Sequence, residues 1–173
     1  MELKPLPVEG GLYRRGYCAK ETIRVDTQQA GDGATRPVGT AIYFLLTTAP
    51  DSFSALHKLP IDEIYHFYLG DPVEMLLLYP DGSSKTVILG QDVLDGQQVQ
   101  FVAPAGVWQG SQLLTREGAD NWGFALLGTT MAPGFHESDY LGGEREALVK
   151  DYPDRRKWIE ELTRPDEPLK RVS

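Results

Sequence analysis

Short segments rich in β-branched and aromatic residues recur along the chain from Thr40 onward, and turn residues separate them. Such segments fit the half-buried surface of a sheet, so each predicts a strand. The expected strands cover residues 41–47, 63–69, 73–79, 86–89, 99–103 and 122–127. Pro80-Asp81-Gly82 predicts a hairpin turn, because proline presets the first turning dihedral and glycine accepts a positive one. Strands of this length and spacing predict an all-β sandwich or barrel.

The segment before the first of these strands has a different character. Residues 28–39 show no apolar periodicity and are dense in glycine and other turn residues, so we expect an exposed loop there. No internal repeat or long low-complexity tract divides the chain. The simplest layout is a single domain over residues 1–173, with a core at about 38–140 and a helical tail at 144–163.

The tail is predicted to be helical. Residues 144–150 predict one helix, and Pro153 suits the first turn of a second, where a missing amide hydrogen costs little. Trp158, Ile159 and Leu162 would share one face of the second helix. That face predicts docking on the barrel exterior or on a neighbouring subunit.

Composition narrows the expected partners. Lys and Arg number 17 and Asp and Glu number 25, which gives a formal net charge of −8 at pH 7. This excess repels nucleic acid and anionic membrane surfaces, so we expect neither as a partner. Cys18 is the single cysteine, and no apolar run approaches the ~20 residues of a membrane-spanning helix. We therefore expect a soluble, cytoplasmic protein.

Two segments about forty residues apart carry the most specific signal. The first, residues 62–70, contains Glu63 followed by six residues and Gly70. The second, residues 104–109, reads Pro-Ala-Gly-Val-Trp-Gln and ends at Gln109. Together they resemble the two motifs of a cupin barrel, in which most metal-binding members have His at the position of Gln109.

The likeness extends over nearly the whole chain. The sequence resembles a small single-cupin family of unknown function, whose fold is similar to that of the sugar-nucleotide epimerases of deoxysugar synthesis. The matching stretches are Glu9-Gly10-Gly11 with Tyr13-Arg14, residues 40–47, 56–59, 62–72, 102–109 and 132–135, and the helix that begins at Tyr152-Pro153. The resemblance implies a jelly-roll barrel, commonly a homodimer, with an internal cavity for a small molecule.

Strand alternation decides which side chains can share that cavity. Successive side chains of a strand face opposite ways, so Glu63, Tyr65 and Phe67 share one face and His66 and Tyr68 share the other. We expect the second pair in an outer packed layer or a subunit interface. Glu63 and Gln109 at inward positions indicate a polar cavity, because buried Glu and Gln are costly unless satisfied.

A divalent transition metal is one hypothesis for this cavity. Metal cupins place an inward Glu beside a His-x-His pair, of which only His57 is present here, since Ala55 occupies the other position. His57 and Glu63 are thus the two remaining ligands of the four that the resemblance implies. The amide of Gln109 is a poor donor for such metals. We therefore favour a cavity without a metal, and the spacing of His136 does not require it as a further ligand.

A cavity without a metal can still move protons. Burial would raise the pKa of Glu63 toward neutrality, and His57 could act as the partner acid or base. Tyr65, Phe67 and Trp108 would supply aromatic walls for a ligand, although core packing is the simpler explanation for the last two.

The N-terminal strand adds two cations. Arg14 and Arg15 would meet an anionic ligand if this strand lies at the barrel mouth. Arg15 also departs from the pattern of the family, which has Glu there, as do Pro7-Val8 and Tyr68. A ligand other than the family's usual one is therefore a fair hypothesis.

The sequence thus predicts an all-β cupin jelly-roll barrel with a short C-terminal helical extension. Its cavity, with His57, Glu63 and Gln109, is predicted to bind a small polar, carbohydrate-like ligand. For an enzyme we favour metal-independent isomerisation or epimerisation, with Glu63 or His57 moving a proton next to a carbonyl. A metal-dependent lyase or oxygenase and a non-catalytic binding protein stay open as alternatives.

Overall fold

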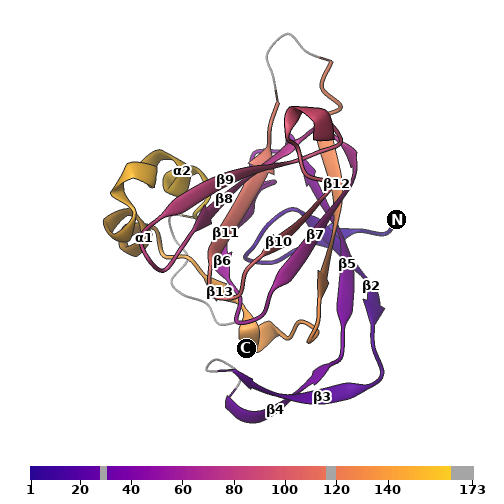
Figure 1. Ribbon diagram of the computed structural model, residues 1–173. Coiled ribbons are helices and arrows are strands. Elements are labelled where there is room, and N and C mark those ends of the chain that lie inside the picture. The colour runs from indigo at the N-terminus through magenta and orange to yellow at the C-terminus, as the bar shows by residue number, and fades with distance from the viewer. Residues whose placement is uncertain (28–30, 116–119, 165–173) are drawn as a thin grey trace.

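The computed structural model describes residues 1–27, 31–115 and 120–164, and two antiparallel sheets face each other in it as a jelly-roll sandwich (Figure 1). The six-stranded sheet contains, in spatial order, β1 (Lys4–Pro5), β2 (Leu12–Cys18), β5 (Thr40–Thr47), β12 (Phe124–Met131), β7 (Glu63–Gly70) and β10 (Gln100–Ala103). The five-stranded sheet contains β13 (Leu141–Gly142), β6 (Ser54–Lys58), β11 (Trp108–Leu113), β8 (Val73–Leu78) and β9 (Ser84–Leu89). The predicted jelly-roll fold is confirmed.

The strands expected from the pattern correspond to β5, β7, β8, β9, β10 and β12, with ends that coincide or differ by up to four residues. The predicted hairpin between β8 and β9 is also present, since Tyr79 N donates to Ser83 O at 2.9 Å and Gly82 has φ of +85°. Residues 73–78 face two packed layers at once. Met75 and Leu77 point into the core between the sheets, whereas Leu76 and Leu78 point toward the helices, which explains why β8 is apolar on both faces except at Glu74.

The exposed loop predicted at residues 28–39 is wrong over its described part. β4 (Gly31–Pro37) pairs antiparallel with β3 (Thr22–Thr27) in a two-stranded ribbon that extends from the sandwich at the bottom of Figure 1. Residues 28–30 lie outside the described residues. The ribbon is held by backbone pairing and by an ion pair of Arg36 with Asp139, so apolar periodicity gave no sign of it.

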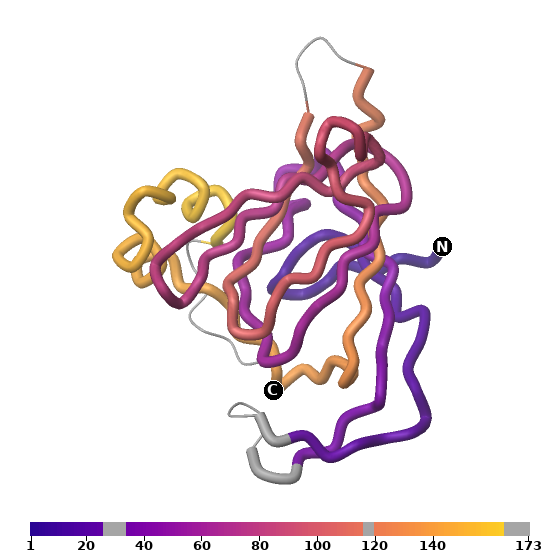
Figure 2. Tube along the Cα trace, in the orientation of Figure 1, coloured from indigo at the N-terminus to yellow at the C-terminus, as the bar shows by residue number. Residues whose placement is uncertain are grey.

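The C-terminal helices α1 (Arg145–Asp151) and α2 (Arg156–Glu161) pack on the outer face of the five-stranded sheet (Figure 2). Ile159 and Leu162 are fully buried against Leu76 and Leu78, and Trp158 is partly buried beside them. Docking on the barrel exterior, one of the two predicted positions for this tail, is thereby confirmed. Short 3₁₀ turns complete the fold at Val93–Asp95, Glu137–Asp139 and Pro153–Arg155. In the described part of the chain, no helix combines the length and the hydropathy needed to cross a bilayer.

Candidate functional site

A cavity of about 160 Å³ lies at the end of the sandwich where β5 and β7 begin and β6 and β12 end. The N-terminal arm closes one side of it, and the segment that follows β12 closes another. Most of the wall is apolar, and the polar groups converge from the two sheets and the arm. The lining residues are Leu6, Pro7, Glu9, Tyr13, Arg15, Thr40, Ile42, His57, Leu59, Glu63, Thr129, Met131, Phe135, Glu137 and Tyr140.

Three side chains predicted for the site form one buried polar cluster. His57 and Gln109 are register partners on β6 and β11, and Glu63 reaches them from β7 of the opposite sheet. The Nε2 of Gln109 donates to Glu63 Oε2 at 2.8 Å and lies 3.3 Å from His57 Nε2. His57 Nε2 and Glu63 Oε2 are 3.8 Å apart, within ion-pair range. The cluster therefore bridges the two sheets.

Glu63 is held as an anion rather than as a protonated acid. Tyr65, one of the predicted site residues, donates its hydroxyl to Glu63 Oε2 at 3.1 Å. Burial alone would raise the pKa of Glu63, but His57, together with hydrogen bonds from Thr129 and Tyr65, lowers it below its ordinary value. The expected rise of the Glu63 pKa is thus wrong, because the partners of the carboxylate outweigh its desolvation. Burial and the nearby carboxylates raise the pKa of Tyr65, so Tyr65 remains a donor.

His57 is fixed through Nδ1 and one ring face. Its Nδ1 lies 2.8 Å from Ala55 O, and its ring stacks on Tyr140 with centroids 5.2 Å apart. Burial alone would lower the pKa of His57, but the charges of Glu9 and Glu63 raise it to about 9. At neutral pH the ring is therefore an imidazolium that directs its Nε2 proton toward Glu63.

Glu9 is a site residue that sequence reasoning did not single out. Its carboxylate accepts from Ser54 Oγ at 2.8 Å and lines the same cavity as His57 and Glu63. Burial raises the pKa of Glu9, and the charge of Glu63 raises it further against the opposing effects of His57 and Ser54. The Glu9-Gly10-Gly11 motif was the available signal. A Cβ on Gly10, which has φ of +100°, would collide with Phe53 O, so this turn requires glycine to place Glu9.

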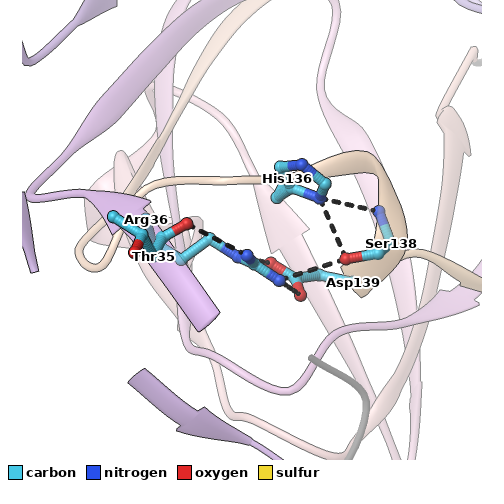
Figure 3. A network of polar contacts seen from close by, with 5 residues as sticks. All are labelled: Thr35, Arg36, His136, Ser138 and Asp139. Carbon is cyan, nitrogen blue, oxygen red and sulfur yellow. Dashed lines mark hydrogen bonds and ion pairs between the residues drawn. The ribbon is translucent and has the colours of Figure 1, made fainter. Parts of the chain in front are cut away.

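The wall that carries Tyr140 is tied to the β3–β4 ribbon by a buried ion pair (Figure 3). Arg36 contacts Asp139 through two bonds, Nε to Oδ2 at 3.0 Å and Nη2 to Oδ1 at 2.7 Å. Arg36 Nη2 also donates to Ser138 Oγ at 3.1 Å, and Ser138 is bonded in turn to His136 Nδ1. Arg36 and Asp139 are both buried. The predicted loop therefore contributes a structural support of the cavity.

Gln109 and Tyr65 contact Glu63 but lie outside the cavity lining, and three other predicted site residues lie outside it as well. Arg14 is exposed and sits over the ring of Tyr43, 5.1 Å from its centroid, because alternation along β2 turns Arg15 toward the cavity instead. Phe67 belongs to the core between the sheets, and Trp108 packs toward the helices under Lys58. For these three residues, the structure supports packing and surface contacts.

The other two histidines, His66 and His136, lie away from the cavity cluster. As alternation predicted, His66 faces away from Glu63, with its Nε2 3.2 Å from Thr130 Oγ1 and its ring stacked on Tyr68. His136 is exposed and caps the turn at Glu137–Asp139 by accepting from Ser138 N. Neither contacts the cluster of His57, Glu63 and Gln109.

The donors at the cavity do not fit a transition metal. Over residues 1–27, 31–115 and 120–164, no group of three or more His, Cys, Asp or Glu is placed to hold a metal ion. His57 and Glu63 lie together, but the carboxylate of Glu9 is not placed to complete a metal site with them. Gln109 presents an amide nitrogen, which carries hydrogens and cannot act as a ligand. Gln109 Oε1 is buried without a hydrogen-bond partner in the described residues.

Comparisons with known proteins agree with this architecture. The family model described as Cupin superfamily (DUF985) matches residues 1–141. An uncharacterised protein of Saccharomyces cerevisiae, YML079W, is 36% identical over 80% of this chain and 70% of its own length. The crystal structure of protein SO0799 from Shewanella oneidensis is 32% identical with a TM-score of 0.79, over 95% of this chain and 93% of that one.

A more distant likeness concerns the fold alone. An oxalate decarboxylase of Bacillus subtilis matches with a TM-score of 0.52 at 11% identity, over 97% of this chain and 39% of that one. This chain therefore corresponds to less than half of the decarboxylase. The similarity to sugar-nucleotide epimerases implied by the sequence stays a prediction.

Proposed function

Since the chain belongs to the cupin superfamily family DUF985, we propose that its cavity binds a small polar molecule and moves a proton on it, as a metal-independent isomerase or epimerase does. The observation that carries this proposal is the convergence of His57, Glu63 and Glu9 on one cavity, with the pKa of one carboxyl raised and that of the other lowered. Titratable groups whose environments push their pKa values apart are typical of acid and base assignments.

The roles follow from these environments. His57 donates its Nε2 proton to a carbonyl oxygen of the ligand, and Glu63 stabilises the imidazolium through the 3.8 Å ion pair. Glu9, whose pKa is raised, accepts the proton from the carbon next to that carbonyl. Glu9 then returns its proton to the other carbon, or to the other face of the same carbon, while His57 recovers a proton from a hydroxyl oxygen of the enediol, which gives the isomer and restores the site. Glu63 thereby serves as a fixed partner rather than as the base.

The size of the cavity limits the ligand. An engineered cavity of about 150 Å³ holds benzene, so 160 Å³ suits a ligand of roughly six to ten non-hydrogen atoms. A short sugar or hydroxycarbonyl compound meets this limit, whereas a sugar nucleotide exceeds it several-fold. The substrate of the proposed proton transfer is therefore a compact carbohydrate-like molecule.

Hydrogen exchange with solvent tests the proposal whichever isomer is formed. The protein is incubated in D₂O with a mixture of glyceraldehyde, dihydroxyacetone and erythrose, and loss of the proton next to the carbonyl is followed by ¹H NMR. We expect exchange above the buffer rate, reduced about 100-fold in Glu9→Gln and in His57→Gln, since acid–base groups contribute on this scale. Glu21→Gln, an exposed carboxylate outside the cavity lining, serves as the matched control.

Binding of these compounds without any exchange would contradict the catalytic part and favour the alternative of a non-catalytic binding protein. Equal exchange in the wild type and in both variants would also contradict it. The metal-dependent alternative receives less support, because His57, Glu63 and Glu9 are not placed to hold one ion and Gln109 presents its amide nitrogen.

We also infer a homodimer that pairs through the outer face of the six-stranded sheet. Tyr68 and Val102 are exposed there, and Val102 is the register partner of Ile64 on the same face. Tyr68 lies over Gly128 and beside Tyr43, so aromatic and aliphatic side chains are gathered on this face. Light scattering at micromolar concentration should give twice the monomer mass, and Val102→Lys should give the monomer. A monomeric wild type would overturn this inference.

A further inference from the structure

The cavity contains more carboxyl groups than cations. Glu9, Glu63 and Glu137 line it, against His57 and Arg15. The other titratable side chains in the lining are the tyrosines Tyr13 and Tyr140. With every group in its ordinary charged form and His57 protonated, three negative charges face two positive ones.

The excess of negative charge is greater in the buried part of the cavity than at its mouth. Arg15 and Glu137 are both exposed, so water and salt screen their charges at the mouth. Farther in, the imidazolium of His57 is flanked by both Glu9 and Glu63. Its charge is therefore already matched, and no second cation of the lining lies inside the cavity to receive an anionic ligand.

A neutral ligand meets no such obstacle. A hydroxyl group can donate to Glu9, whose carboxylate has Ser54 as its hydrogen-bonding partner, and a carbonyl can accept from His57. An anionic group would have to give up its water beside two carboxyl groups, which is costly without a paired cation. The charge pattern thus discriminates between molecules of similar shape.

We propose, building on the function proposed above, that the ligand is an uncharged hydroxyl- or carbonyl-bearing molecule and that Glu9 and Glu63 make the cavity reject carboxylates and phosphate esters. This assignment deepens the proposed function by naming a substrate class. It also sets aside the anionic ligand that Arg14 and Arg15 had suggested, since Arg14 lies outside the lining and Arg15 lies at its exposed edge.

Three probes with one carbon skeleton test the proposal on the wild-type protein. D-Glyceraldehyde, D-glycerate and D-glyceraldehyde 3-phosphate are titrated separately at pH 8 into ¹⁵N-labelled protein, and the backbone amides of Glu63 and Thr129 are followed by NMR. We expect the neutral probe to bind at least tenfold more tightly than either anion. Equal affinities, a reversed order, or no shift at these amides with any probe up to 50 mM would overturn the proposal.

Two charge-removing variants locate the source of the selectivity. Glu9→Gln should raise the affinity for D-glycerate about tenfold, because it removes a carboxylate and keeps the shape of the side chain. Glu137→Gln removes the same charge from the exposed edge of the lining and should change that affinity less than threefold. Equal gains in the two variants would overturn the role of Glu9, and the wild-type order of affinities decides the proposal even if Glu9→Gln does not fold.

The two proposals fail in different ways. If the neutral probe binds more tightly but exchanges no proton in D₂O, the substrate class stands and the catalytic function falls. If exchange occurs on a charged substrate, the catalytic function stands and the charge selectivity falls.

Discussion

His57 and Glu63 approach each other from opposite sheets, with Nε2 and Oε2 3.8 Å apart. Each side chain has further contacts within the fold. His57 is fixed by Ala55 O and by the ring of Tyr140, whereas Glu63 accepts from Tyr65 and Gln109. The ion pair is therefore formed by the fold itself and needs no ligand to assemble it. Its charge state is a property of folding that can be measured before any substrate is known.

The stability of the protein should depend on pH through His57. The pKa of His57 is raised from an ordinary 6.5 to about 9 in the folded protein, so folding favours the protonated ring. This contribution is fully present below pH 6.5 and is lost as the pH rises through about 9. Its upper limit is roughly 3 kcal/mol. Urea unfolding between pH 6 and pH 10 should show a falling free energy of unfolding, and NMR should show the imidazole titrating near pH 9.

Glu63→Gln provides the control for this dependence. The variant keeps the shape of the side chain but removes one of the two charges that raise the pKa of His57. The imidazole midpoint should then move to lower pH, and the free energy of unfolding should vary less between pH 6 and pH 10. A His57 midpoint near 6.5 in the wild type would contradict the assignment of a charged ring.

Removal of Arg36 should destabilise the protein strongly. Arg36→Ala leaves the buried carboxylate of Asp139 without its ion-pair partner, and such losses typically cost 3–5 kcal/mol. We expect a decrease of about that size in the free energy of unfolding. Arg156→Ala, which breaks an exposed pair with Glu160, should cost less than about 1 kcal/mol.

The same variant also tests whether the ion pair positions the cavity wall. Tyr140 follows Asp139 directly and stacks on His57, so Arg36→Ala should shift the midpoint of the His57 titration. The double variant Arg36→Met, Asp139→Leu removes both charges and should recover most of the stability. A destabilised Arg36→Ala protein with an unchanged His57 midpoint would limit the ion pair to a structural role.

Local patterns predicted six strands that face a core on at least one side, but they missed β6 and β11, which are also largely buried. β7 is the clearest case, because Glu63, Tyr65 and Phe67 are buried while His66 and Tyr68 point outward, as alternation requires. β4 was missed because no local pattern marks it. Its anchor is the pairing of Arg36 with Asp139, 103 residues later, and no local window contains both partners.

The candidate site was predictable only in part for the same reason. The resemblance identified His57, Glu63 and Gln109, and the structure brings these three together. Glu9 stood in a motif, but its approach to the cavity depends on the N-terminal arm folding back onto β6, where Ser54 binds it. The shift of the Glu63 pKa depends on His57, Thr129 and Tyr65 as well as on burial. Burial considered alone therefore predicted a shift in the wrong direction.

The helical tail should contribute to the stability of the whole domain. Leu162→Ala empties a fully buried position against the five-stranded sheet, and such truncations cost 2–5 kcal/mol. We expect a loss in this range in urea unfolding, in a single transition. Leu94→Ala is the matched control, because Leu94 is 95% exposed and its truncation should change the free energy of unfolding by less than about 0.5 kcal/mol. A separate early transition for Leu162→Ala would show instead that the tail unfolds on its own.

Metal content decides between proton transfer by side chains and metal-dependent chemistry. The protein, purified without a histidine tag, is incubated with iron, manganese, nickel and zinc, desalted and measured by inductively coupled plasma mass spectrometry. We expect well below one metal per chain, since His57, Glu63 and Glu9 are not placed to hold one ion and Gln109 turns its amide nitrogen toward His57 and Glu63. His57→Ala should leave that residual content unchanged. Near-stoichiometric metal that disappears in His57→Ala would contradict this expectation, because it would require Gln109 to rotate so that its buried Oε1 faces the metal.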